Sequence, residues 1–259
     1  MTRSIRLAIG ITVLIAGTAH AQVTVPNSAA GVEADGTFAL TATAAAGRTY
    51  QFTIDSNQLT GLIGQQIGGM QWRLNGTAAA AWPPADVSYA FWDVFIGPGV
   101  DPTAMSNTFA SNFTGGATQV RSGAAAFTAG SFTNGASPNA FGPALNFSSP
   151  YLYTGGDLTI EMRFAPQVGT TTAPSFDAAL ASGGPGNGWG VDFSARWTAN
   201  SAGVTGANGN FLATTFVTVP EPSSIALVGI GLAFLAFRKK RSAYSSKTKP
   251  DAQLALLQQ

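Results

Sequence analysis

The chain has 259 residues, of which 45% are hydrophobic and 10% charged; it contains no cysteine, and His20 is its only histidine. A chain so composed cannot build a Ser-His-Asp triad, a Cys-His dyad, a typical structural zinc site, a c-type haem or an iron-sulfur cluster once residues 1–21 are removed. The formal net charge is +1, but residues 22–219 contain no lysine and more carboxylates than arginines. Without a basic patch to neutralise phosphates, we expect no nucleic-acid partner.

The N-terminal segment has the pattern of a secretory signal peptide. Arg3 and Arg6 precede an apolar stretch from Leu7 to Ala16, and Ala19-His20-Ala21 supplies small residues at the two positions that a signal peptidase reads. We therefore expect residues 1–21 to direct export through the Sec machinery and to be removed, so that the mature chain begins at Gln22. The alternative is a second transmembrane helix.

Residues 22–219 show the alternation of half-buried strands. Apolar side chains alternate with polar ones in residues 50–54, 70–74, 158–164 and 189–197, which places Arg73, Glu161 and Arg196 on the water side. Phe211 to Val219 is predicted to be the last strand. The expected core side chains share the inward positions of these strands: Trp72, Leu74, Phe91, Val94, Ile160, Met162, Val191 and Phe193.

Val87 to Ile96 is apolar on both sides, so we expect one strand covered on both faces. Clusters of Gly, Pro, Asn and Ser separate the strands. Short strands with such turns, and no helical periodicity in residues 22–219, predict an all-β fold: an antiparallel β-sandwich or jelly-roll-like ectodomain.

After the last predicted strand comes a rigid segment, Val219-Pro220-Glu221-Pro222, followed by an apolar run from Ile225 to Phe237 and by Arg238-Lys239-Lys240-Arg241. As a helix the run would reach about 20 Å, short of the hydrocarbon core but long enough for a membrane anchor with help from its flanks. The basic residues predict that residues 242–259 stay in the cytoplasm as a tail and that everything before the run is outside.

The order Pro-Glu-Pro, apolar run and basic stop over residues 220–241 resembles the PEP-CTERM sorting signal of Gram-negative bacteria. That resemblance implies processing by an exosortase, a membrane-embedded enzyme. Residues 50–74, 89–96, 105–112, 119–123 and 141–160 also resemble a recurring group of PEP-CTERM ectodomains. An ordinary C-terminal tail anchor is the alternative interpretation.

The function expected from these features is that of an exported, non-enzymatic surface or extracellular-matrix protein, structural or adhesive in association with exopolysaccharide. It would pass through an inner-membrane-anchored intermediate, without a cofactor, a metal or catalytic residues. The alternative is a secreted carbohydrate-binding or glycoside-hydrolysing module.

Specific side chains would be needed for sugar stacking, glycoside hydrolysis or calcium binding. Trp82, beside Pro83-Pro84 in a predicted loop, is the expected exposed ring for sugar stacking. A glycosidase would need two carboxylates, and calcium would need several oxygen ligands. The glycosidase candidates are Asp93, Asp157, Glu161 and Asp192, although Glu161 is more simply a solvated residue and Asp157 a turn residue that caps backbone amides; the calcium candidates are Asp55, Asp86 and Asp101.

Overall fold

The computed structural model describes residues 22–40 and 45–219. The predicted signal peptide, the segment from Pro220 to Arg241 and the predicted tail therefore lie outside the described residues. The described part is built of antiparallel β-strands joined by turns and short 3-10 helices, which confirms the all-β prediction. Among the described residues, none of the helices has the length and apolar character needed to cross a membrane.

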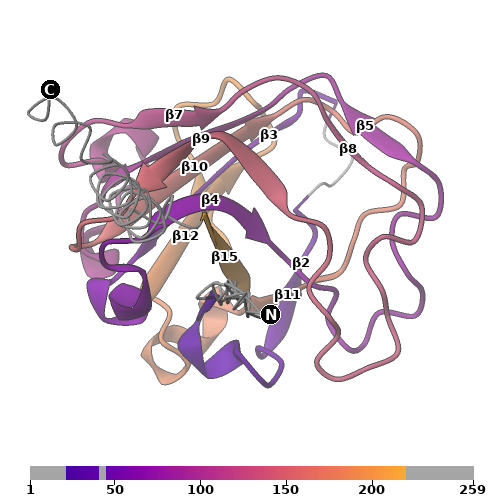
Figure 1. Cartoon of the computed structure of the whole chain (residues 1–259), viewed down its shortest axis with the longest axis horizontal. Helices are drawn as coiled ribbons and strands as arrows, with labels where there is room; N and C mark the ends of the chain where they lie inside the picture. Colours follow the sequence, from indigo (N-terminus) through magenta and orange to yellow (C-terminus); the bar gives the residue numbers. More distant parts are fainter. Residues whose placement is uncertain (1–21, 41–44, 220–259) are drawn as a thin grey trace, which may run out of the picture. The chain divides into compact units, whose positions relative to one another are not determined.

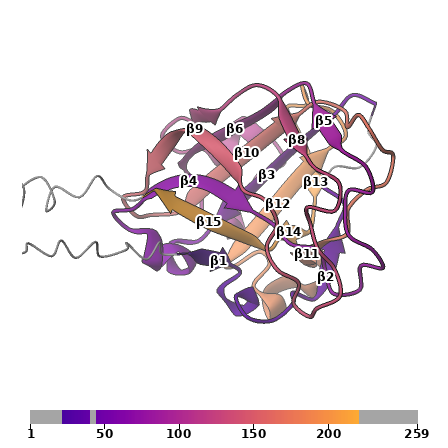
Figure 2. The same cartoon turned by 45° about the vertical axis from the view of Figure 1, so that its right-hand side comes forward.

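Two larger antiparallel sheets form the layers of the fold, and β4 lies over β10 and β3 in Figures 1 and 2. The four-stranded sheet has the order β1 (Val23–Val25), β15 (Thr214–Val219), β4 (Gln66–Gln71) and β9 (Leu145–Leu152). The six-stranded sheet has the order β13 (Ala207–Asn208), β12 (Phe193–Thr198), β3 (Arg48–Ile54), β10 (Leu158–Phe164), β6 (Trp92–Pro98) and β7 (Thr118–Arg121).

Smaller elements close the remaining sides. One small sheet contains β14 (Phe211–Leu212), β11 (Phe176–Ala179) and β2 (Gly36–Phe38), and another pairs β5 (Val87–Tyr89) with β8 (Ala125–Phe127). The 3-10 helices are η1 (Asn27–Ala29), η2 (Ser56–Leu62), η3 (Pro102–Ala104), η4 (Phe109–Asn112) and η5 (Ala181–Asn187). The predicted last strand is thus divided at Ala213, where the chain passes from β14 to β15.

One hydrophobic core joins these sheets, and aromatic rings fill much of it. Trp92 stacks on Phe164 at 4.4 Å between centroids and on Trp72 at 6.0 Å. Large aromatic side chains bury much apolar area each, which lets a chain without disulfides hold its fold by packing. Six of the expected core residues are buried as predicted: Trp72, Leu74, Val94, Ile160, Met162 and Phe193.

The other two core predictions are wrong. Phe91 is only half-buried, because it lies between β5 and β6 rather than inside a strand. Val191 is 45% exposed, because β12 begins only at Phe193 and Val191 lies in the turn before it. The segment Val87–Ile96 is correspondingly two strands, β5 paired with β8 and β6 paired with β10, and not one.

Several side chains predicted to face water are buried. Gln51, Thr159 and Ser194 on the outer face of the six-stranded sheet are at most 1% exposed, and Glu161 is 3% exposed. Glu161 accepts a hydrogen bond from Gln51 Nε2 at 2.8 Å, and Arg163 pairs with its other oxygen. The expectation of a solvated Glu161 is therefore wrong. Glu161 does lie on the polar face of its strand, but that face is covered.

The reason is a segment of residues 99–114, here called the covering segment, that runs over this face. Its backbone carbonyls accept hydrogen bonds from Thr53 Oγ1 (at Val100, 2.9 Å), Ser194 Oγ (at Pro102, 2.9 Å) and Arg196 Nη2 (at Met105, 2.7 Å). Each buried polar group thus exchanges water for a backbone acceptor, which removes the cost of burying it.

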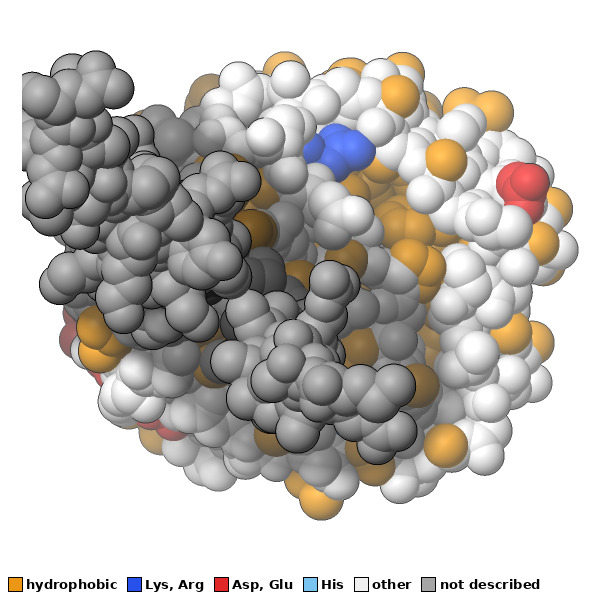
Figure 3. Space-filling view, viewed as in Figure 1, with side chains coloured by type: hydrophobic (Ala, Val, Ile, Leu, Met, Phe, Trp, Pro, Cys, Tyr) orange, Lys and Arg blue, Asp and Glu red, His pale blue; other side chains and the backbone are white. Residues whose placement is uncertain are grey.

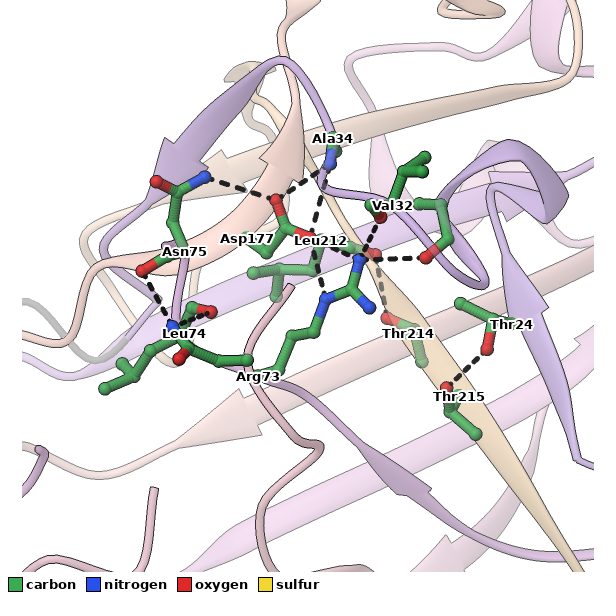
Figure 4. Close-up of polar contacts among 12 residues, drawn as sticks. Thr24, Val32, Ala34, Arg73, Leu74, Asn75, Asp177, Leu212, Thr214 and Thr215 are labelled. Atoms are coloured by element: carbon green, nitrogen blue, oxygen red, sulfur yellow. Dashed lines mark hydrogen bonds and ion pairs between the residues drawn. The ribbon is translucent and has the colours of Figure 1, made fainter. Parts of the chain in front are cut away.

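Arg73 is also buried, where an outward position was predicted. Its Nε donates to Asp177 Oδ2 at 2.9 Å, and its Nη2 donates to the carbonyls of Ala29 and Val32 (Figure 4). The backbone N–H of Ala34 donates to Asp177 at 3.0 Å. The Arg73–Asp177 ion pair connects the segment before β2 to the strands that carry these two side chains. The side chains of Arg73 and Asp177 are 2% and 0% exposed.

Candidate functional site

β15 is an inner strand of the four-stranded sheet and the last described element of the chain. On one side it pairs with β1, with Val23 opposite Phe216 and Val25 opposite Thr214. A hydrogen bond of 2.7 Å between Thr24 Oγ1 and Thr215 Oγ1 crosses this pair. On the other side β15 pairs with β4 up to its last residue, since Val219 lies opposite Gln66.

The end of β15 is held by an irregularity in β4. The register shifts between Val217 and Thr218, so that Val217 lies opposite Gly69 while Thr218 lies opposite Ile67. Gly68 falls at this shift, and a Cβ added to it would meet Val219 Cγ2 at 2.3 Å. Thr218 is 4% exposed. The sheet therefore fixes the chain up to Val219, immediately before Pro220.

The predicted mature N-terminus lies beside this exit. Gln22 is exposed and directly precedes β1, whose first residue is opposite Phe216 of β15. The two ends of the described chain thus emerge at one end of the ectodomain. Ala19 and Ala21, which the cleavage prediction needs, lie outside the described residues, as do Pro220, Glu221, Pro222, the run from Ile225 to Phe237 and the basic residues Arg238 to Arg241.

Three carboxylates converge at the same end. Asp55 follows β3, Asp101 follows β6 and Asp157 precedes β10; since β10 pairs with both other strands, the three strand ends lie together. One oxygen from each carboxylate lies within 4.8 Å of the others. Two of the three calcium candidates, Asp55 and Asp101, are therefore neighbours, whereas Asp86 lies elsewhere and accepts from Ala129 N at 2.7 Å.

Each of these carboxylates already binds backbone amides. Asp55 Oδ1 accepts from Asn57 N and Asp101 Oδ1 from Thr103 N, both at 2.8 Å, so that they cap η2 and η3. Asp157 Oδ1 accepts from Ser56 N at 2.9 Å, so it caps a backbone amide at the start of η2 and not one of its own turn. Carboxylate oxygens suit hard cations, but the contacts present are those of turn and helix capping.

The pKa values of two members of the cluster, Asp157 and Asp101, are shifted in opposite directions. Burial, together with the charges of Asp55 and Asp101, raises the pKa of Asp157 against the opposing hydrogen bond from Ser56. Hydrogen bonds from the Thr103 hydroxyl and backbone lower the pKa of Asp101. Burial and the charge of Asp157 raise the pKa of Tyr153 to about 12.

Sequence reasoning missed Asp157 as the third member of this cluster. The available signal was position: Asp55 directly follows one alternating segment and Asp157 directly precedes another. Antiparallel neighbours bring the end of one strand to the start of the next. The pairing of β3 with β10, which joins these two ends, could not be read from the sequence.

Trp82 is 2% exposed, so the prediction of an exposed ring is wrong. Its indole N–H donates to the Thr172 carbonyl at 2.8 Å, and its ring packs against Phe132 at 5.5 Å and Phe176 at 5.8 Å. The prolines after it made a loop the simplest reading, but that loop folds back over the core. Neither face of this ring is open to a sugar.

The remaining glycosidase candidates, Asp93 and Asp192, accept hydrogen bonds from neighbouring segments. Asp93 in β6 is half-buried and accepts from Gly123 N at 3.3 Å. Asp192 accepts from Asn57 Nδ2 at 3.2 Å in the turn before β12. On the face in Figure 3, the described residues present mostly uncharged side chains.

Comparison with known proteins identifies the segment that begins in β15. Residues 218–241 match the family model of the PEP-CTERM protein-sorting motif. Neither the curated proteins nor the solved structures contain a significant match to the chain. The motif is a substrate signal for exosortase processing, and it implies export and a membrane-anchored sorting intermediate. The chain thus carries a PEP-CTERM protein-sorting motif, which begins within the last two residues of β15.

Proposed function

We propose that this protein is a non-enzymatic component of the cell surface or extracellular matrix, delivered by Sec export and released from its membrane anchor by an exosortase. The observation that carries the proposal is the overlap of the sorting motif, residues 218–241, with β15, which ends at Val219. The motif follows the folded ectodomain without a linker, so that the whole ectodomain is the cargo of the sorting step.

The sequence of the motif supports a separate role for each of its three parts. Pro220 and Pro222 lack backbone N–H groups, so the chain cannot continue β15 as a paired strand beyond Val219. Proline disfavours helix in itself and in the residue before it, which suits an enzyme that must reach the backbone near the membrane. Ile225 to Phe237 would hold the substrate in the bilayer, and Arg238 to Arg241 would stop its transfer across.

The role proposed for the ectodomain is structural or adhesive, and its buried polar side chains serve the fold. Thr53 and Ser194 bind the covering segment, and Arg73 pairs with Asp177. Association with exopolysaccharide would then not depend on stacking at Trp82, since that ring is buried. The carbohydrate-active alternative loses its predicted stacking residue, because Trp82 is buried.

Replacement of the sorting residues tests this function. Pro220→Ala, Glu221→Ala and Pro222→Ala together should leave the protein in the inner membrane with its tail attached, because the exosortase no longer reads the segment. A matched control changes three exposed ectodomain residues, Ser182, Pro185 and Gly186, to Ala. Delivery of the Pro-Glu-Pro variant to the surface at the level of the control would contradict the proposal.

A further inference from the structure

We propose that, in the membrane-anchored intermediate, the end of the ectodomain formed by Ile63, Leu152 and Val219, here called the apolar rim, lies on the lipid headgroups of the membrane that holds the chain. The inference rests on the proposed function, because it requires an intermediate anchored through residues 225–237. It goes beyond it by assigning a membrane-contact surface to the folded part of the chain.

The rim surrounds the point at which β15 leaves the sheet. Leu152 of β9 and Val219 of β15 both lie opposite Gln66 of β4, and cross-strand partners share one face of a sheet. Ile63 directly precedes Gly64, whose N–H donates to the Tyr153 carbonyl at 2.8 Å. The exposed fractions of Ile63, Leu152 and Val219 are 57%, 50% and 37%, respectively.

The length of the connecting segment sets how far the rim can be from lipid. Residues 220–224 separate Val219 from Ile225, and even fully extended the six Cα–Cα steps between these two residues span only about 20 Å. The headgroup layer itself occupies about 6 Å on each side of the hydrocarbon core. The rim therefore cannot leave the neighbourhood of the headgroups while the chain is anchored.

Because the rim is confined near the membrane, even a weak attraction is sufficient to keep it in contact with lipid. Scattered apolar side chains on a free protein need no partner, but a tether keeps the local concentration of lipid surface around this end permanently high. Val168 is 62% exposed yet lies at the opposite end, where it follows the far end of β10 and pairs with Ser88. It is the matched control, because it is apolar and exposed without being within reach of the membrane.

The negative charge at the same end of the ectodomain determines which lipid headgroups the rim can approach. Asp55, Asp101 and Asp157 lie at the ends of strands of the other sheet, and Asp157 is joined to the rim through Tyr153, whose hydroxyl donates to the Gly156 carbonyl. Carboxylates repel an anionic surface over about a Debye length of 10 Å at 0.1 M salt. The rim should therefore contact zwitterionic headgroups more closely than anionic ones.

The absence of cysteine makes a direct test simple. Full-length chains carrying Leu152→Cys, Ile63→Cys or Val168→Cys are labelled with a fluorophore and reconstituted into vesicles of phosphatidylethanolamine and phosphatidylcholine. Iodide should quench the labels at positions 152 and 63 several-fold less than the label at position 168. Adding phosphatidylglycerol to the vesicles at low salt should narrow that difference.

Equal quenching at the two ends in chains that float with the vesicles would overturn the rim contact and leave the anchored intermediate standing. Chains that do not float with the vesicles would overturn the intermediate, and the rim contact with it. Protection at position 152 that rises with the protein-to-lipid ratio would assign the rim to a second copy of the chain. Protection that requires added exosortase would assign it to the enzyme, and either result would contradict a lipid contact.

Discussion

The side chain of Val219, the last residue before the Pro-Glu-Pro segment, occupies the space over Gly68 that any larger residue there would need. This contact holds the end of β15 against β4 at the register shift between the two strands. The backbone of Gly68 does not adopt a positive φ, so a substitution there acts through space alone.

Gly68→Ala should therefore displace Val219 and loosen the last residues of β15. Overpacking of this kind costs about 1–3 kcal/mol, and the loss should appear as a lower urea midpoint with an unchanged slope. Gly31→Ala is the control, because nothing lies within 4 Å of a Cβ added there. Equal stability of the two variants would show that Val219 is not fixed by this contact.

The ion pair of Arg73 and Asp177 gives a second prediction. Asp177→Ala leaves a buried guanidinium without its carboxylate and should cost about 3–5 kcal/mol of unfolding free energy. Arg163→Ala should cost less, because that guanidinium is 39% exposed and the buried carboxylate of Glu161 keeps its hydrogen bond from Gln51. The double variant Arg73→Met with Asp177→Leu should lose less than the two single variants combined; strict additivity would mean that the pair does not couple.

The acidic cluster gives stability effects of opposite sign with pH. The pKa of Asp157 is raised above 3.8 in the folded state, so the folded protein binds more protons than the unfolded chain as pH rises through that value, and stability is lost. Asp157→Asn keeps an oxygen for Ser56 N and removes the charge. Its stability relative to the parent protein should therefore increase from acid to neutral pH.

Asp101→Asn should behave in the opposite way. The pKa of Asp101 is lowered below 3.8, so its charged form favours folding above that value and the benefit is lost as pH falls. The variant should lose most, relative to the parent protein, at neutral pH. Urea unfolding of both variants across this range provides the measurement, and slopes of the same sign would contradict the arrangement of the cluster.

The sequence predicted the parts of the fold that depend on local alternation. Tyr50, Phe52 and Ile54 face the core as their spacing requires, and the all-β class follows from such segments. It could not predict that the polar sides of the same strands would be covered, because the covering segment lies far away along the chain. The outward side chains of Thr53 and Ser194 are buried only because carbonyls of residues 100 and 102 reach them.

The candidate site was predicted unevenly for the same reason. The sorting motif is a contiguous pattern and was recognisable from residues 220–241 alone. The acidic cluster depends on which strand lies beside which, and only two of its members had been grouped. Trp82 was misplaced because its neighbouring prolines indicated a loop, whereas the burial of that loop depends on Phe132 and Phe176.

The predicted cleavage before Gln22 offers a separate test of the proposed export. Ala19 and Ala21 are the small residues that a signal peptidase reads. Replacing both with Trp should leave an uncleaved precursor held in the membrane, whereas replacing both with Ser should preserve processing. N-terminal sequencing of the exported protein should find Gln22, and a start at Met1 would contradict the signal-peptide interpretation.

The central claim is that an exosortase releases the ectodomain from its membrane anchor. The most direct measurement is the intact mass of the protein in each cell fraction, from the parent strain and from one that lacks every exosortase. We expect the parent strain to yield a surface form that has lost its C-terminal segment, and the deficient strain to retain the full tail in the inner membrane. Surface delivery with equal removal of the tail in both strains would contradict the claim and leave Ile225 to Phe237 as an ordinary anchor.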